Sequence, residues 1–219
     1  MMAGPEDAKK SRGAKSGGQG GGASVEQAVV PAYPFNIWLC RPMADGITVN
    51  VLSWSPLEAH LIFGENESSL NQKTASIKLL SGQPVDFVLS KLKPNSKYYY
   101  QLVYHTSDGV EHRADVASFQ TQRLPGKAFT FAIQADSHLD VSTDPKLYQQ
   151  TLKNIAKDGP DFLIDLGDTS MVDKFGSQFK KAESQYLAQR YYLGQIAHSV
   201  PLFMVLGNHD GEVGSRLAG

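Results

Sequence analysis

The spacing of apolar residues changes near residue 125, and this change limits the fold more than any other feature of the sequence. Over residues 34–121, apolar and polar residues alternate in short segments separated by turn residues. Beyond residue 127, nearly continuous apolar runs alternate with segments of helical period. Strands with one buried face have a period of two, whereas strands of a parallel sheet are apolar on both faces. The chain is therefore predicted to contain two different domains.

The first domain is predicted to be an all-β sandwich over residues 34–123. Seven segments in fewer than a hundred residues have strand patterns, which favours two packed antiparallel sheets. The histidines of this region, His60, His105 and His112, share no spacing and are expected at the surface. The expected strands are 37–40, 47–54, 59–63, 75–80, 85–89, 98–104 and 115–121.

One local motif specifies the kind of sandwich. Leu92, Pro94, Tyr98 and Tyr100 resemble the tyrosine corner of fibronectin type III modules. In that corner a tyrosine hydroxyl bonds to backbone a few residues upstream and fixes the crossing between the two sheets. The resemblance implies a fibronectin III-like sandwich and a structural role for the tyrosines.

Residues 127–219 have the pattern of a parallel α/β sheet, in which strands alternate with helices. Asp144 followed by Pro145 indicates the start of the first helix, and Gly159-Pro160 indicates its end. The second helix is expected at about 178–197. The expected strands, each buried on both faces, are 129–135, 162–166 and 202–206.

Polar residues follow each of these three strands directly. Because ligands of open α/β sheets bind at the carboxyl ends of the strands, the three groups are expected to converge on one edge. Alternatively, the aspartates could cap helices, which explains each alone but not their joint placement. The groups are Asp136-Ser137-His138, Gly167-Asp168 and Gly207-Asn208-His209-Asp210.

These residue types suit a pair of metal ions. Asp136 and His138 could bind one cation, Asp168 could bridge two, and Asn208 offers a neutral oxygen, a donor set that fits Mn, Fe, Zn or Mg. Two ions about 3.5 to 4 Å apart would generate hydroxide near neutral pH and bind the oxygens of an in-line displacement at phosphorus. The sequence therefore points to hydrolysis of phosphate esters.

His209 and Asp210 complete the expected chemistry. His209 could protonate the leaving alkoxide while Asp210 orients the imidazole ring. The glycines before Asp168 and Asn208 are expected to allow sharp turns and to leave room for a ligand.

In this order, the motifs D-S-H, L-G-D and G-N-H-D resemble the opening motifs of the calcineurin-like metallophosphoesterase family. A fibronectin-like sandwich ahead of them is similar to the layout of purple acid phosphatases. The resemblance implies a multidomain chain, namely the sandwich followed by the first half of an α/β metallophosphoesterase domain. It implies two divalent or mixed-valence metal ions (Fe, Mn or Zn), with Asp136 and His138 on the first, Asp168 bridging, Asn208 on the second, and His209 as the acid supported by Asp210.

Two departures from purple acid phosphatases concern the first metal. Met171 stands where those enzymes usually carry the tyrosine that colours ferric iron, and His138 stands where glycine is common. The resemblance therefore implies a colourless enzyme closer to the general metallophosphoesterase pattern.

The family supplies further histidine ligands downstream of the third motif, and this sequence shows no replacement for them. His198 is the other histidine of the α/β part and is expected to meet a helix C-terminus instead. The first metal would then have three protein ligands and the second only two. We expect the chain as given to be a fragment with little or no hydrolase activity.

Composition narrows the alternatives. A net charge of −1 argues against a nucleic-acid binder, and Cys40, the single cysteine, excludes an internal disulfide. No apolar run is long enough to span a membrane. Residues 1–30 are expected to be a flexible Gly/Lys-rich tail without a visible signal peptide, although the resemblance suggests secretion or the periplasm.

The second candidate function is a protein- or glycan-binding sandwich with a decayed hydrolase half.

Overall fold

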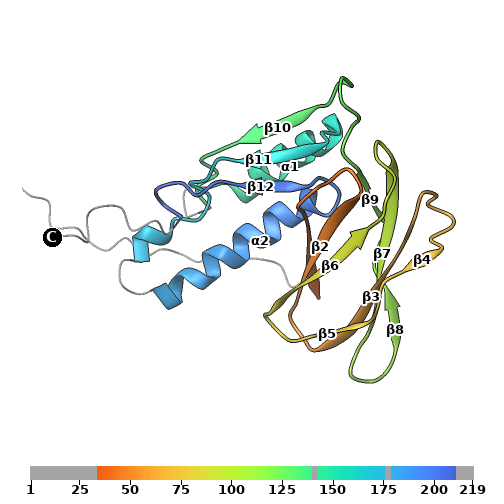
Figure 1. The fold of residues 1–219 in the computed structure, drawn as a ribbon. Coiled ribbons are helices and arrows are strands. Elements are labelled where there is room, and N and C mark those ends of the chain that lie inside the picture. Colours follow the sequence, from red (N-terminus) through yellow and green to blue (C-terminus); the bar gives the residue numbers. More distant parts are fainter. Residues whose placement is uncertain (1–33, 140–142, 176–178, 211–219) are drawn as a thin grey trace, which may run out of the picture.

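The computed structural model describes residues 34–139, 143–175 and 179–210. It consists of an antiparallel β-sandwich and a three-stranded parallel sheet with two α-helices (Figure 1). The expected tail at 1–30 lies outside the described residues. Within the described part, no helix combines the length and apolarity needed to cross a bilayer.

Two antiparallel sheets form the sandwich, which confirms the predicted fold. The first contains β1 (Phe35–Cys40), β2 (Gly46–Ser53) and β6 (Pro84–Ser90). The second contains β3 (Leu57–Gly64), β4 (Gln72–Lys73), β5 (Ile77–Leu79), β7 (Lys97–His105), β8 (Glu111–Arg113) and β9 (Ala117–Gln120). Their inner faces enclose one apolar core, to which Leu39, Val49, Leu61, Phe87 and Leu102 contribute fully buried side chains.

Strands β4 and β8 were not predicted from the sequence. Both are two or three residues long and contain only exposed polar residues, so they show no apolar alternation. The surface prediction for His60 is wrong, because β3 pairs with β4 and β5 on one side and β7 on the other and is buried on both faces. Burial accordingly lowers the pKa of His60.

The tyrosine corner is present. The hydroxyl oxygen of Tyr98 accepts a hydrogen bond of 3.0 Å from the backbone N–H of Lys93, five residues upstream. Leu92 and the rings of Tyr98 and Tyr100 are buried. Tyr100 has a different role, because its hydroxyl donates to the carbonyl of His198 in the α/β region at 2.7 Å.

The α/β region has the predicted order of elements. Three parallel strands, β10 (Phe131–Gln134), β11 (Phe162–Asp165) and β12 (Leu202–Met204), lie in that order in the sheet. The α-helices are α1 (Pro145–Asp158) and α2 (Glu183–Ala197), and two 3₁₀ turns, η1 (Val172–Phe175) and η2 (Phe179–Ala182), precede α2. The second helix therefore begins later than the predicted residue 178, which itself lies outside the described residues.

The ends of α1 follow the sequence signals. The carboxylate of Asp144 accepts from the backbone N–H of Lys146 at 2.9 Å, and Pro145 occupies the first turn. Gly159 ends the helix in the left-handed conformation, at φ 61°. At the end of α2, a ring nitrogen of His198 lies 2.9 Å from the carbonyl of Gly194, which agrees with the expected contact with the helix C-terminus.

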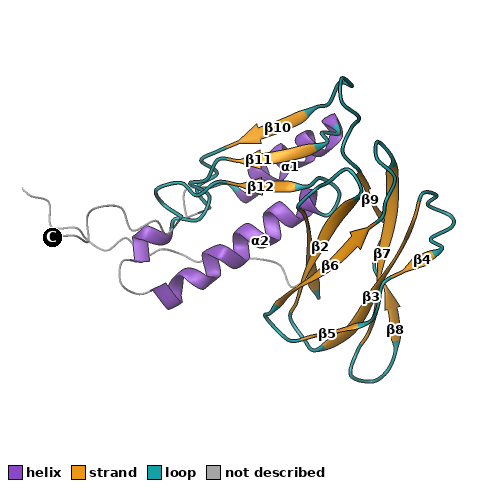
Figure 2. Ribbon diagram, viewed as in Figure 1, coloured by secondary structure: helices purple, strands orange, loops and turns teal. Residues whose placement is uncertain are grey.

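The prediction that the parallel strands are buried on both faces is wrong for the described chain. Side chains of α1 and α2 pack with Leu163 and Leu202 on one face of the sheet. The opposite face carries Phe131, Ile133 and Phe203, which are 45%, 55% and 43% exposed. Both faces are apolar, as the sequence indicates, but the described helices cover only one of them (Figure 2).

The sandwich packs directly on α2. The indole N–H of Trp38 in β1 donates to the carbonyl of Arg190 at 3.1 Å, and the guanidinium of Arg190 lies 4.6 Å from the centroid of the Trp38 ring. Arg190 also donates to the side-chain oxygen of Asn50 in β2 at 2.6 Å. One turn further along α2, a Cβ on Gly194 would lie 1.9 Å from the amide nitrogen of Asn36. The two parts therefore meet in close contact.

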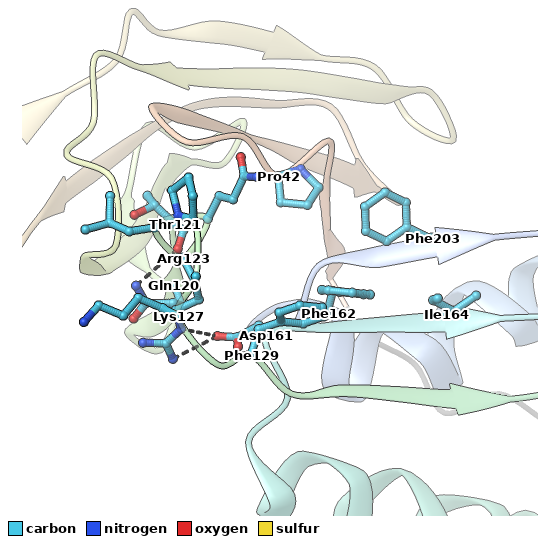
Figure 3. A pocket seen from close by; sticks show the side chains of 14 residues that line it. Pro42, Gln120, Thr121, Arg123, Lys127, Phe129, Asp161, Phe162, Ile164 and Phe203 are labelled. Atoms are coloured by element: carbon cyan, nitrogen blue, oxygen red, sulfur yellow. Dashed lines mark hydrogen bonds and ion pairs between the residues drawn. The ribbon is translucent and has the colours of Figure 1, made fainter.

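The segment between the two parts is held by an ion pair. The guanidinium of Arg123 lies 2.9 Å from the carboxylate of Asp161, just ahead of β11 (Figure 3). A cavity of about 600 Å³ opens beside this pair, and its lining is mostly apolar and includes the rings of Phe129, Phe162 and Phe203. It lies at the amino ends of the strands, opposite to the edge where the polar motifs gather.

The tyrosine corner makes a prediction for stability. Tyr98→Phe removes the oxygen that accepts from Lys93 and leaves this part-buried N–H without its partner. We expect a loss of about 1 to 3 kcal/mol in the free energy of unfolding, measured by urea denaturation. Tyr99→Phe, on the half-exposed face of the same strand, is the matched control and should change the stability little. Equal effects of the two variants would contradict the role of the corner.

Candidate metal centre

Hydrogen bonds join the loops that follow β10 and β11. The backbone N–H of Asp136 donates to the carbonyl of Gly167 at 2.9 Å, and that of His138 donates to Asp168 at 3.1 Å. Leu139 continues the series with a bond of 2.9 Å to Thr169. The two chain segments thus stay paired beyond the ends of the strands, which places the D-S-H motif beside the G-D motif.

Three predicted ligands come together at this point. Asp136, His138 and Asp168 each offer one ligand atom, and these atoms lie within 4.8 Å of one another. Asp136 is exposed, whereas His138 and Asp168 are partly buried, so the group opens toward solvent on one side. The structure brings these three together, and their function as metal ligands remains a prediction.

All three residues have left-handed backbone conformations. The φ angles are 56° at Asp136, 45° at His138 and 52° at Asp168. Such angles are uncommon for residues other than glycine, and each costs on the order of 1–3 kcal/mol unless the surroundings hold it. Strained residues of this kind cluster at functional sites. The pairing of the two loops supplies the required support.

The donor atoms fit a cation. The Nε2 atom of His138 is buried and makes no hydrogen bond, although it lies 3.3 Å from a carboxylate oxygen of Asp136. A buried nitrogen without a partner is unfavourable, and a metal ion bound between imidazole and carboxylates would satisfy it. One oxygen of Asp168 accepts from the backbone N–H of His209 at 2.8 Å, and no donor within the described residues occupies the second oxygen, which can therefore face a ligand.

The G-N-H-D motif wraps around Asp168. The ring of His209 lies edge-on to that of His138, with 5.8 Å between the centroids, so the predicted acid is next to the predicted ligands. Asn208 is exposed between Gly207 and His209 at the same edge of the sheet. The third motif therefore lies where the α/β pattern predicts it, and the roles of Asn208 and His209 remain predictions.

Asp210 has contacts that differ from those expected. Its two carboxylate oxygens accept hydrogen bonds from four backbone N–H groups, those of Asp168, Thr169, Ser170 and Gly207, at 2.7 to 3.0 Å. From the sequence, this carboxylate was expected to orient the imidazole of His209. Neighbouring residues in a turn direct their side chains differently, and here Asp210 points into the loop backbone.

Asp165 is a residue that the sequence analysis missed. It is fully buried and accepts from the N–H of Gly167 and the hydroxyl of Thr169, both at 2.9 Å, and from the side-chain amide of Gln134 at 2.6 Å. Its signal in the sequence is an aspartate inside an apolar strand. The same Gln134 amide donates to the hydroxyl of Tyr148, whose pKa burial raises to about 12.

The two glycines ahead of Asp168 and Asn208 do not leave room for a ligand. Gly167 turns the chain at φ 91°, as expected, but a Cβ there would lie 2.2 Å from the backbone nitrogen of Gly207. A Cβ on Gly207 would lie 2.2 Å from a carboxylate oxygen of Asp168. The space that these glycines leave is filled by the neighbouring loop, which draws the second and third motifs together.

A cavity adjoins the group of ligands. Its volume is about 430 Å³, and it lies between the end of β10 and the first turns of α1. Asp136 and His138 line one side, and Thr143, Leu147 and Thr151 line the other. This size is within the range of small-molecule sites.

Met171, the residue at the position of the colour-giving tyrosine, is buried.

Comparisons with known proteins agree with this geometry. Residues 129–218 match the family model of the calcineurin-like phosphoesterases. No curated protein sequence matches the chain. A structure of PhoD superposes with a TM-score of 0.53 at 14% identity, over 82% of this chain and 40% of PhoD. Purple acid phosphatase PPD1 from seeds of yellow lupin (Lupinus luteus) superposes with a TM-score of 0.54 at 18% identity, over 79% of this chain and 35% of that enzyme.

These two solved structures share the fold of this chain, a β-sandwich followed by an α/β region. The chain spans well under half of either structure. The predicted order is thus confirmed: a β-sandwich precedes a region that matches the calcineurin-like phosphoesterase model.

The close approach of the glycines predicts a large effect at one of them. Gly167→Ala places a methyl group against the backbone of Gly207 and also strains the left-handed φ. We expect the free energy of unfolding to fall by more than about 3 kcal/mol in chemical denaturation. Gly126→Ala, at φ 79° with open space around it, isolates the cost of φ alone and should lose about 1–2 kcal/mol. Similar losses of stability in both variants would contradict the close contact between the loop after β11 and the loop after β12.

Proposed function

We propose, from the membership of residues 129–218 in the calcineurin-like phosphoesterase family, that this chain carries the first part of the active site of a metal-dependent phosphoric ester hydrolase. The observation that carries the proposal is the group Asp136, His138 and Asp168, three strained residues whose donor atoms converge around an unbonded imidazole nitrogen. We take the substrate class, phosphate esters, from the family. The cavity has room for many small esters and does not select among them.

The proposed ligands would form two sets. Asp136 and His138 would hold a first ion, and the second oxygen of Asp168 would face both ions. Asn208 would give a neutral oxygen to a second ion. When bound, Fe, Mn or Zn ions supply an activated hydroxide and neutralise the charge on phosphate oxygens. Every protein ligand in this set is an oxygen or an imidazole nitrogen, which suits these metals.

His209 would act as the general acid. Its backbone N–H is bonded to Asp168, and its ring lies beside that of His138, so the imidazole is held at the edge of the ligand group. A protonated imidazole there can give its proton to the leaving oxygen of an ester that lies over the ligands. The cavity between β10 and α1 gives such an ester room beside Asp136.

The sandwich has the position of a scaffold. Trp38 and Asn50 bind Arg190 of α2, and Tyr100 binds the end of the same helix. A module that recognises a protein or glycan independently needs no such attachment. These contacts favour the hydrolase over the alternative of a binding sandwich with a decayed hydrolase half.

Metal binding tests the site directly. We expect calorimetric titration of the chain with Mn²⁺ to show one main site, because Asp136, His138 and Asp168 form the one group of three such ligands in the described residues. Asp136→Asn and His138→Ala should each weaken binding at least tenfold.

The exposed His112, in the sandwich, gives the control His112→Ala, which should leave the Mn²⁺ affinity unchanged. Two tight sites would contradict the proposed count of ligands. Equal affinities of wild type and His138→Ala would exclude this histidine as a ligand.

Ester hydrolysis tests the function. With Mn²⁺ or Zn²⁺ and 4-nitrophenyl phosphate, we expect a slow rate that a chelator abolishes, since the second ion has few ligands on this chain. Asp168→Asn should remove this rate, and His209→Ala should lower it at least tenfold, within the usual contribution of a general acid. A rate that neither the chelator nor the variants alter would refute the proposal.

A further inference from the structure

Asp210 has an unusual environment for a carboxylate. The residue is 5% exposed, and both of its carboxylate oxygens are occupied by backbone N–H groups. Burial of a carboxylate is costly unless strong donors replace water. Hydrogen bonds from N–H groups to an ionised carboxylate are about twice as strong as neutral ones. Four such bonds fix the position of the Asp210 carboxylate in the fold.

These bonds join two loops. The three consecutive N–H groups of Asp168, Thr169 and Ser170 turn toward one anion, as in the backbone nests that bind anions in other proteins. The fourth donor is Gly207, on the loop after β12. Successive N–H groups can converge in this way only where the chain leaves regular structure, as it does at the left-handed Asp168.

A second contact connects Asp210 with helix α2. The hydroxyl of Tyr186 donates to the backbone carbonyl of Asp210 at 3.0 Å. Burial and then the charge of Asp210 raise the pKa of Tyr186. One turn along the same helix, Arg190 binds Trp38 and Asn50 of the sandwich. The loop that carries His209 is thus attached both to Asp168 and to α2.

We propose that Asp210 is a positioning residue for Asp168. Its carboxylate fixes the loop after β11 against the loop after β12, and it acts through the backbone and not through the ring of His209. This inference rests on the proposed function, because the purpose of the fixed loop is to hold Asp168 at the metal ions.

The four hydrogen bonds to the carboxylate make Asp210→Asn an informative variant. One oxygen of Asp210 accepts from Asp168 and Gly207, and the other accepts from Thr169 and Ser170. An asparagine amide keeps one oxygen and turns an NH₂ group toward two N–H donors, in either orientation. One pair of hydrogen bonds is therefore lost and replaced by repulsion, with almost no change in volume.

Amide hydrogen exchange tests the contact without metal. In the 219-residue chain, the N–H groups of Asp168, Thr169, Ser170 and Gly207 should be protected in wild type and should exchange much faster in Asp210→Asn. The amides of β11 should keep their protection. Unchanged exchange at the four groups would overturn the proposal.

A double-mutant cycle on Mn²⁺ affinity tests the positioning role. Asp210→Asn should weaken binding about 10- to 100-fold, as for other residues that support metal ligands. The same factor should appear in a His209→Ala background, because the imidazole takes no part. Loss of the effect in that background, or an unchanged affinity of Asp210→Asn, would overturn the proposal. The control is Asp161→Asn, which removes a carboxylate at the opposite edge of the sheet and should leave the affinity unchanged.

Two further results are informative. If wild type binds no Mn²⁺, the proposed function fails, and amide exchange alone decides whether Asp210 joins the loops. If Asp210→Asn does not fold, Tyr186→Phe replaces it, because the partly exposed ring can keep its place. That variant should raise exchange at Asp168–Ser170 and weaken Mn²⁺ binding by a smaller factor, and unchanged values would overturn the proposal.

Discussion

The left-handed backbone at Asp136, His138 and Asp168 is the constraint on which the site depends. Without support, each residue would relax to an ordinary conformation, because the left-handed conformation costs free energy. This cost is comparable to what a single contact contributes to stability, so several contacts are needed to offset it. The hydrogen bonds between the loops after β10 and β11 prevent this relaxation. The same bonds place the side chains of Asp136 and His138 next to Asp168. The strain and the convergence of the ligands thus have one cause.

Contacts from neighbouring residues hold the loops after β10, β11 and β12 in place. Asp165 and Asp210 bind the loop backbone from two sides, and Tyr186 fastens the third motif to α2. The helix in turn packs on the sandwich through Arg190 and Trp38. Precise placement of ligands requires support of this kind, because a displacement of about 1 Å at a reacting group can cost 10²-fold in rate. The sandwich therefore belongs to the framework of the site.

The sequence alone predicts much of this arrangement. The period of the apolar residues indicates the strands and helices. Ligands of open α/β sheets bind at the carboxyl ends of the strands, so the place of the site is also predictable. It also predicts the contacts of Tyr98 and Asp144. The burial of His60 and the exposure of Phe131 depend on which neighbours cover each face, which no local pattern records. The partner of Asp210 depends on the direction of one side chain in a turn. The left-handed angles arise only when both loops are in place.

The central claim is that Asp136, His138 and Asp168 bind a metal ion together. A crystal of the chain soaked in Zn²⁺, measured at the zinc absorption edge, tests it most directly. The account predicts an anomalous peak about 2.0–2.2 Å from Nε2 of His138 and from carboxylate oxygens of both aspartates. A zinc ion bound elsewhere, with these three side chains turned apart, would contradict it.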